Sequence, residues 1–184
     1  LYIADYTNGV IRRVDAATGL INTVGGGLPA TPACVAVDQA GNVYFGDHHT
    51  DRVFRLDGGG KLTAVAGNGA EGYSGDGVLA TSTRLWDPSG LAVDRSGNLF
   101  IADTNNCRIR RVDAATGIIT TAAGTGTPCI YAGDGGPATS AGLEGPQGVA
   151  VDAGGNLYIA DTNVMRIRRV DARTGVITTI AGNG

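Results

Sequence analysis

One five-residue stretch, Leu157-Tyr-Ile-Ala-Asp161, decides the fold because it occurs in three earlier variants along the chain. The earlier copies are Leu1-Tyr-Ile-Ala-Asp5, Val43-Tyr-Phe-Gly-Asp47 and Leu99-Phe-Ile-Ala-Asp103. Short apolar runs of this kind, bounded by turn residues, are typical of β-strands. Their recurrence predicts a chain built from four similar units.

Further apolar runs accompany each copy in a fixed order. In the fourth unit they are Ile167-Arg-Arg-Val170 and Ile177-Thr-Thr-Ile180, and a preceding run is Val149-Ala-Val-Asp152. The first unit lacks such a preceding run. Four short strands per repeat predict a propeller blade, so we expect an all-β fold, a β-propeller with four visible four-stranded blades, the first without its inner strand. The expected blades span residues ~1–27, 28–69, 70–126 and 127–184.

Turn signals separate these runs. Gly155-Asn156 lies between the first and second strands of the fourth unit, and Asp171-Ala-Arg-Thr-Gly175 lies between the third and fourth strands. Glycine and asparagine tolerate positive φ, which tight hairpins require. No segment shows a sustained 3.6-residue period, so no helix is expected.

The links between blades and the loops between second and third strands share one face, which we call the upper face. The long links before the third and fourth units contain Gly72-Tyr-Ser-Gly-Asp-Gly77 and Ile130-Tyr-Ala-Gly-Asp-Gly135, whereas the link before the second unit is short. Asp76 and Asp134 each offer one carboxylate among glycines. Calcium takes six to eight oxygen ligands, so we expect these aspartates to shape the loops.

The repeat resembles the NHL repeat family of β-propellers in three phrases: Pro146-Gln-Gly-Val-Ala-Val-Asp152, Gly155-Asn-Leu-Tyr-Ile-Ala-Asp161 and Arg166-Ile-Arg-Arg-Val170. The other units repeat these phrases with small changes, so the resemblance covers essentially the whole chain. It is similar in particular to bacterial extracellular NHL proteins with a Gly-Asp-Gly loop between blades. The resemblance implies a closed ring of about six blades. Further blades of the same chain, or another copy, are therefore expected at the open edges.

Charge and hydropathy exclude some partners. The formal net charge of −3 argues against a nucleic-acid ligand, and no apolar run is long enough to predict a membrane span. Most arginines lie on the expected third strands, close to the turn aspartates Asp15, Asp57, Asp113 and Asp171. We expect a solvated rim of alternating charge there, with an anion-binding stripe as the alternative.

We favour a non-enzymatic binding or structural module whose ligand surface lies on the upper face. Aromatic and amide side chains on loops suit a protein or a glycan ligand. The candidate ligand-binding residues are Tyr6, His48, His49, Tyr73, Trp86, Asn105 and Tyr131. Adjacent side chains such as His48 and His49 diverge and form a poor chelating pair, so neither a metal site nor a cofactor is predicted.

Two alternatives stay open. The chain is part of an NHL-fold lyase or hydrolase whose active site needs further blades, or it is a self-assembly module that uses open ring edges. No catalytic residue is assigned, because the aspartates that end the second strands recur in every unit. We expect these four to bind backbone amides of the loop that follows each of them: Asp5, Asp47, Asp103 and Asp161.

The cysteines carry a further prediction. Cys107 and Cys129 both break the repeat, and both belong to upper-face loops near the junction of the third and fourth units. We therefore predict a disulfide between them, which favours a secreted, periplasmic or cell-surface protein. Cys34 takes a place that glycine holds in the third and fourth units, and we expect it to be a small buried residue.

Overall fold

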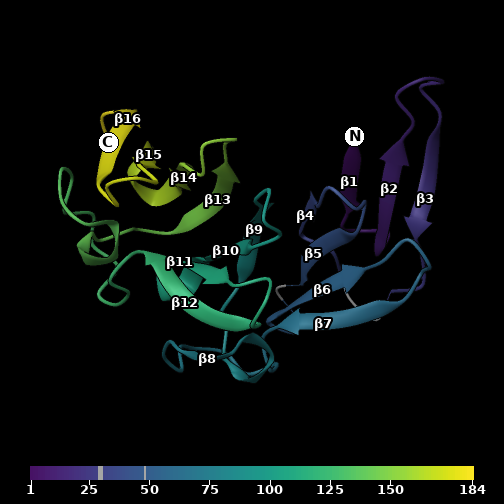
Figure 1. Ribbon diagram of the computed structural model, residues 1–184, viewed down its shortest axis with the longest axis horizontal. Coiled ribbons are helices and arrows are strands. Elements are labelled where there is room, and N and C mark those ends of the chain that lie inside the picture. Colours follow the sequence, from purple (N-terminus) through teal and green to yellow (C-terminus); the bar gives the residue numbers. More distant parts are fainter. Residues whose placement is uncertain (29–30, 48) are drawn as a thin grey trace.

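The computed structural model describes residues 1–28, 31–47 and 49–184, and it consists almost entirely of antiparallel β-sheets. Four sheets follow one another along the chain. Figure 1 shows them as an open arc, with the N-terminal sheet at one tip and the C-terminal sheet at the other. This arrangement confirms the expected all-β propeller of four blades.

Each sheet is one blade, and its strands are hydrogen-bonded in chain order. The first blade has β1 (Tyr2–Asp5), β2 (Val10–Val14) and β3 (Ile21–Gly25). The second has β4 (Cys34–Val37), β5 (Val43–Asp47), β6 (Arg52–Leu56) and β7 (Leu62–Ala66). The third has β9 (Pro88–Val93), β10 (Leu99–Asp103), β11 (Arg108–Val112) and β12 (Ile118–Ala123). The fourth has β13 (Pro146–Val151), β14 (Leu157–Asp161), β15 (Arg166–Val170) and β16 (Ile177–Ala181).

One strand was not expected from the sequence. The short strand β8 (Val78–Leu79) comes from the link before the third blade and pairs with β12, so that this sheet has five strands. Pro137 forms a single bridge to Val176 in the corresponding place of the fourth blade. The long links therefore run along the outer edge of the blade that follows them, where they cover a strand edge that would otherwise be unpaired.

The hydrophobic core lies between blades rather than within one sheet. Ile11 of the first blade packs with Val43 and Phe45 of the second, and similar clusters fill the next two junctions. The strand register places alternate side chains on opposite faces, so each blade offers one apolar face to each neighbour. Each blade therefore depends on its neighbours for burial of its apolar residues.

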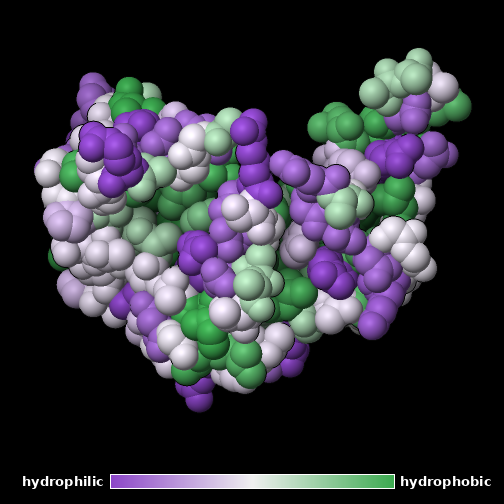
Figure 2. All heavy atoms as spheres, viewed as in Figure 1, coloured by the Kyte–Doolittle hydropathy of each residue, from purple (hydrophilic) through white to green (hydrophobic). Residues whose placement is uncertain are grey.

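Each end blade has one face whose apolar residues are more exposed than their equivalents elsewhere in the chain. Ile109 of the third blade is 0% exposed, but Ile167 at the same repeat position in the fourth is 37% exposed. In the first blade Ile21 is 49% exposed, whereas its equivalent Ile177 is 0% exposed. Figure 2 shows hydrophobic atoms at the outer end of the first blade, around the turn that joins β2 to β3.

The Ile109→Ala substitution should lower the free energy of unfolding by about 2–5 kcal/mol, because it opens a cavity between two blades. Ile167→Ala removes the same atoms from a partly exposed position and should have about half that effect or less. Urea unfolding of the two variants measures the difference. An equal loss would mean that another surface covers Ile167 in solution.

Candidate functional site

The structure brings together two candidate residues from neighbouring blades. Tyr6 lies between β1 and β2, and His49 lies between β5 and β6. The Tyr6 hydroxyl is 2.9 Å from Nε2 of His49, and the two rings stack with their centroids 6.1 Å apart. Both side chains are exposed on the upper face. The other histidine candidate, His48, lies outside the described residues.

The same loop of the second blade is fixed to the link that carries Trp86. Oδ1 of the buried Asp51 accepts a hydrogen bond from the Asp87 amide at 2.9 Å, and burial raises the pKa of Asp51. The Asn105 amide in turn donates to the Trp86 carbonyl at 3.2 Å. Trp86 is 39% exposed, and Asn105 is exposed as well. We call four of the exposed candidates the upper-face patch: Tyr6, His49, Trp86 and Asn105.

Tyr73 and Tyr131, the remaining candidates, have a different environment. Each ring lies against two guanidinium groups, an arrangement in which the ring face attracts the cation. The distances from the guanidinium carbon to the ring centroid are 3.8 Å and 4.9 Å for Arg108 and Arg110 with Tyr73, and 4.0 Å and 4.7 Å for Arg166 and Arg168 with Tyr131. Both tyrosines are therefore engaged by the blade that follows their link.

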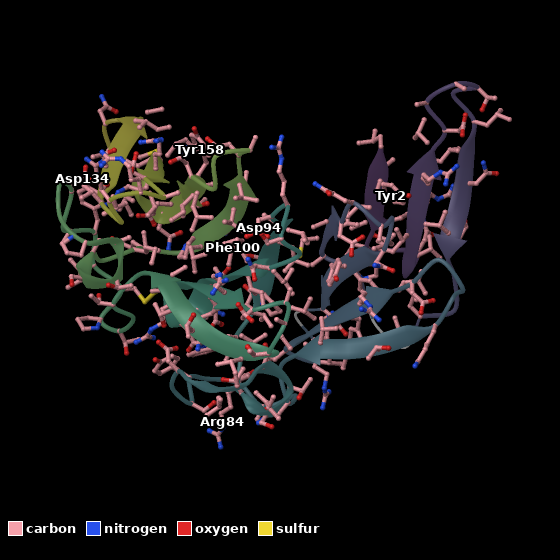
Figure 3. The ribbon with its side chains drawn as sticks, in the orientation of Figure 1. Tyr2, Arg84, Asp94, Phe100, Asp134 and Tyr158 are labelled. Atoms are coloured by element: carbon pink, nitrogen blue, oxygen red, sulfur yellow. A yellow bond between two sulfur atoms is a disulfide. The ribbon has the colours of Figure 1, made fainter. Side chains whose placement is uncertain are left out.

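Arg168 anchors the link before the fourth blade. Its side chain is fully buried, and Nη2 and Nε lie 2.7 Å and 3.0 Å from Oδ1 of Asp134. Nη1 donates to the Gly142 carbonyl at 3.2 Å and lies 3.6 Å from Oδ2 of Asp161. Figure 3 shows Asp134 on the link, at the outer side of the arc. The guanidinium thus joins the Gly-Asp-Gly loop to the aspartate that ends β14.

Arg110 makes the equivalent contacts in the third blade. It lies 2.7 Å from Asp76 and 3.6 Å from Asp103, and it is also fully buried. Asp76 additionally accepts hydrogen bonds from the amide and hydroxyl of Thr121 at 3.0 Å and 3.1 Å. The two Gly-Asp-Gly aspartates therefore shape their loops, and they do so by binding the third and fourth strands of the next blade.

In the third and fourth blades, the prediction of a solvated arginine rim is correct for one arginine of the pair and wrong for the other. Arg111 and Arg169 lie at the rim, each 3.1 Å from a turn aspartate, Asp113 or Asp171. Arg110 and Arg168 are buried instead. Successive side chains on a strand point to opposite faces, so two adjacent arginines cannot share one environment.

Three of the four aspartates that end the second strands are buried hydrogen-bond acceptors, and only one of the three accepts from the expected backbone amide. The fourth, Asp5, is half-buried and accepts a hydrogen bond from the side-chain amide of Asn8 at 2.8 Å. Asp47 accepts from the amide of His49 in the following loop at 3.0 Å, as predicted. Asp103 accepts from the amide of Trp86 at 2.8 Å, and Asp161 from the amide of Glu144 at 2.7 Å, both in the preceding link. Burial raises the pKa of Asp103 to about 6 and also raises that of Asp161. The long links, which fold over these aspartates, explain the change of partner.

The structure contains a disulfide between Cys107 and Cys129, with the two Cα atoms 5.7 Å apart. It appears as the yellow bond in Figure 3 and joins the loop after β10 to the link before the fourth blade. Cys34 is a free, half-buried cysteine whose thiol donates to the Pro88 carbonyl at 3.6 Å. Burial raises the pKa of this thiol to about 12, which keeps it protonated at neutral pH.

Metal-ligand clusters and membrane-spanning helices are both missing from the part of the chain that the structure describes. In residues 1–28, 31–47 and 49–184, no group of three or more His, Cys, Asp or Glu side chains could hold a metal ion. Within the same residues, no helix is long and apolar enough to cross a membrane.

Sequence comparison finds relatives along the whole chain. A family profile described as the teneurin NHL domain matches residues 1–129 and 122–184. Teneurin-3 of Danio rerio is 36% identical over 166 residues, which are 83% of this chain and 5% of that protein. Protein SUPPRESSOR OF QUENCHING 1, chloroplastic, of Arabidopsis thaliana is 31% identical over 138 residues, which are 63% of this chain and 13% of that protein. The chain thus spans a small part of the length of these relatives.

Structure comparison finds the same architecture at low identity. A Bacteroides thetaiotaomicron protein of unknown function has a TM-score of 0.79 at 22% identity, over 91% of this chain and 43% of that chain. A chain of the nidogen/laminin complex has a TM-score of 0.70 at 19% identity, over 96% and 60%. A streptogramin B lyase has a TM-score of 0.63 at 17% identity, over 97% and 49%. Identities this low show a common fold and nothing finer.

Replacing Arg168 with alanine should lower the free energy of unfolding by about 3–5 kcal/mol, because the buried Asp161 loses its cationic partner. Arg169→Ala, at the adjacent rim position, should lower it by less than about 1 kcal/mol. Chemical denaturation of both variants measures the contrast. Equal effects would contradict the structural role that we assign to the buried guanidinium.

Reduction of the Cys107–Cys129 bond should lower the free energy of unfolding by about 2–4 kcal/mol, because the bond closes a loop of about 20 residues in the unfolded chain. Thiol titration under denaturing, non-reducing conditions should detect one free cysteine, and a Cys34→Ala control should detect none. Three free thiols in the native protein would contradict the disulfide.

Proposed function

This chain belongs to the teneurin NHL domain family, and we propose that it is a non-enzymatic binding and structural module that presents its upper-face patch to a protein partner. The observation that carries the proposal is the patch itself. Tyr6 and His49 are exposed yet hydrogen-bonded to each other, and the backbone on both sides of Trp86 is hydrogen-bonded. Aromatic side chains held in fixed positions lose little conformational entropy on binding and dominate many protein interfaces.

A protein is the ligand class that we favour, with a glycan as the alternative. One structural relative is a chain of a complex of nidogen with laminin, so a propeller of this fold occurs in a protein complex. That support is at the level of the fold. The relation to the streptogramin B lyase is of the same kind, at 17% identity. No residue of this chain is assigned a catalytic role by it.

We further propose a secreted, periplasmic or cell-surface location. The Cys107–Cys129 disulfide supports it, because such bonds persist in oxidising compartments. The resemblance to extracellular bacterial NHL proteins points in the same direction and favours a bacterial source.

Assembly through the end blades is a second candidate function. The exposed Ile21 and Ile167 support it, because they occupy positions that are buried between blades elsewhere in the chain. A further blade or a second copy would bury both of these faces.

The patch can be tested with labelled protein on panels of immobilised extracellular proteins and of glycans. For any ligand found, Tyr6→Ala combined with Trp86→Ala should raise the Kd at least about tenfold, because buried aromatic residues carry much of an interface's energy. Arg95→Ala, an exposed position on the turn between β9 and β10 at the opposite face, is the matched control and should not change the Kd. If the double variant binds as tightly as the native protein, the upper-face patch is not the ligand surface.

A further inference from the structure

The two Gly-Asp-Gly loops are bound in the same way by the blade that follows them. In the third blade, Asp76 contacts Arg110 on β11 and Thr121 on β12, and these two residues are register partners. In the fourth blade, Arg168 and Thr179 are register partners at the same place. Arg168 binds Asp134, and the Thr179 hydroxyl lies 3.2 Å from that of Tyr131 in the same loop. An arginine and a threonine opposite each other thus form a binding site for the loop.

The second blade shows what occupies these positions when no such loop precedes. The link before it is short and contains no Gly-Asp-Gly. Its register partners at the two positions are Phe54 and Ala64, and the Phe54 ring stacks on Phe45 with the centroids 5.5 Å apart. Within this chain, the arginine–threonine pair therefore occurs with the loop and is replaced by apolar residues without it.

The first blade has the same arginine–threonine pair. Arg12 on β2 and Thr23 on β3 are register partners at the same positions. Nε of Arg12 lies 3.1 Å from Oδ2 of Asp5, the aspartate that ends β1. This contact corresponds to those of Arg110 with Asp103 and of Arg168 with Asp161. The Arg12 side chain is 35% exposed, whereas those of Arg110 and Arg168 are 0% exposed. The Arg12 guanidinium, which has no such loop against it, is therefore partly exposed to solvent.

We propose that Arg12 and Thr23 form a docking site for one more Tyr-x-Gly-Asp-Gly loop, supplied by a further NHL blade that packs on the exposed face of the first blade. The charges are complementary, because the loop brings a carboxylate to Arg12 as Asp76 and Asp134 do to their arginines. The apolar surface is complementary too, since Ile21 beside the site is 49% exposed. The site lies on the side of the first blade and shares no residue with the upper-face patch.

The chain itself supplies the spacing that such a loop needs. Asp76 precedes Leu99 by 23 residues, and Asp134 precedes Leu157 by the same 23. Residues 1–5 have the same sequence as residues 157–161. A copy of residues 124–156 joined to Leu1 therefore places a Gly-Asp-Gly loop at the right distance and also adds the inner strand that the first blade lacks.

The test compares this extended protein, with the copied Cys129 changed to serine, with a matched version in which the copied Asp134 is changed to asparagine. Hydrogen exchange of the Thr23 amide is the readout, because the Thr121 amide donates to Asp76 in the third blade. The aspartate version should exchange at least about tenfold more slowly at Thr23. Arg12→Phe, the residue of the second blade, should abolish the difference, and Arg13→Ala at the rim should leave it in place. Equal exchange in the aspartate and asparagine versions would overturn the proposal.

A second measurement applies if an extended variant does not fold. The peptide Gly-Tyr-Ser-Gly-Asp-Gly, the sequence of residues 72–77, is titrated into the 184-residue protein and followed by NMR at the Thr23 amide. A saturable shift that is absent at Ala64, and absent with asparagine in place of the peptide's aspartate, supports the docking site. No shift, or equal shifts with the two peptides, overturns it.

Discussion

A guanidinium buried between two carboxylates holds each long link to the blade that follows it. Arg168 joins Asp134 of the link to Asp161 at the end of β14, and no part of its side chain is exposed. Burying the ionised Arg168 and Asp161 side chains carries a desolvation penalty that the ion pairs offset only when the geometry is good and every partner is present. Such a network therefore specifies one position for the link more than it adds to stability.

The position of the upper-face loops follows from this constraint. Asp103 contacts Arg110 and also accepts a hydrogen bond from the backbone amide of Trp86. One carboxylate therefore connects the buried ion pair to an exposed aromatic residue. The amide of the next residue, Asp87, is bound by Asp51 from the second blade. Hydrogen bonds from two blades therefore hold the backbone at Trp86 in place, while the Trp86 ring is exposed.

The repeat predicted the blades and their strand order because four copies of one pattern leave little choice of fold. It did not reveal that Arg110 is buried, because two adjacent arginines are typical of an exposed, charged strand. Only the alternation of side chains along the strand places them on opposite faces. The second blade, which is complete but has no Gly-Asp-Gly loop before it, has Phe54 and Ala64 in place of the arginine and the threonine. This difference in sequence could have indicated that Arg110 is buried against such a loop. The contact between Tyr6 and His49 joins different blades, so no local pattern could predict it.

The repeated and the exceptional positions of this chain have different tasks. The repeated ones, such as the aspartates that end the second strands, bind backbone amides and arginines, and a change at any one of them affects a buried polar network. His49 and Trp86 vary from blade to blade, and their side chains are exposed. Because the buried ion pairs, and not these side chains, fix the links, the exposed residues can change without loss of the fold. This separation is what allows one propeller scaffold to carry unrelated binding surfaces.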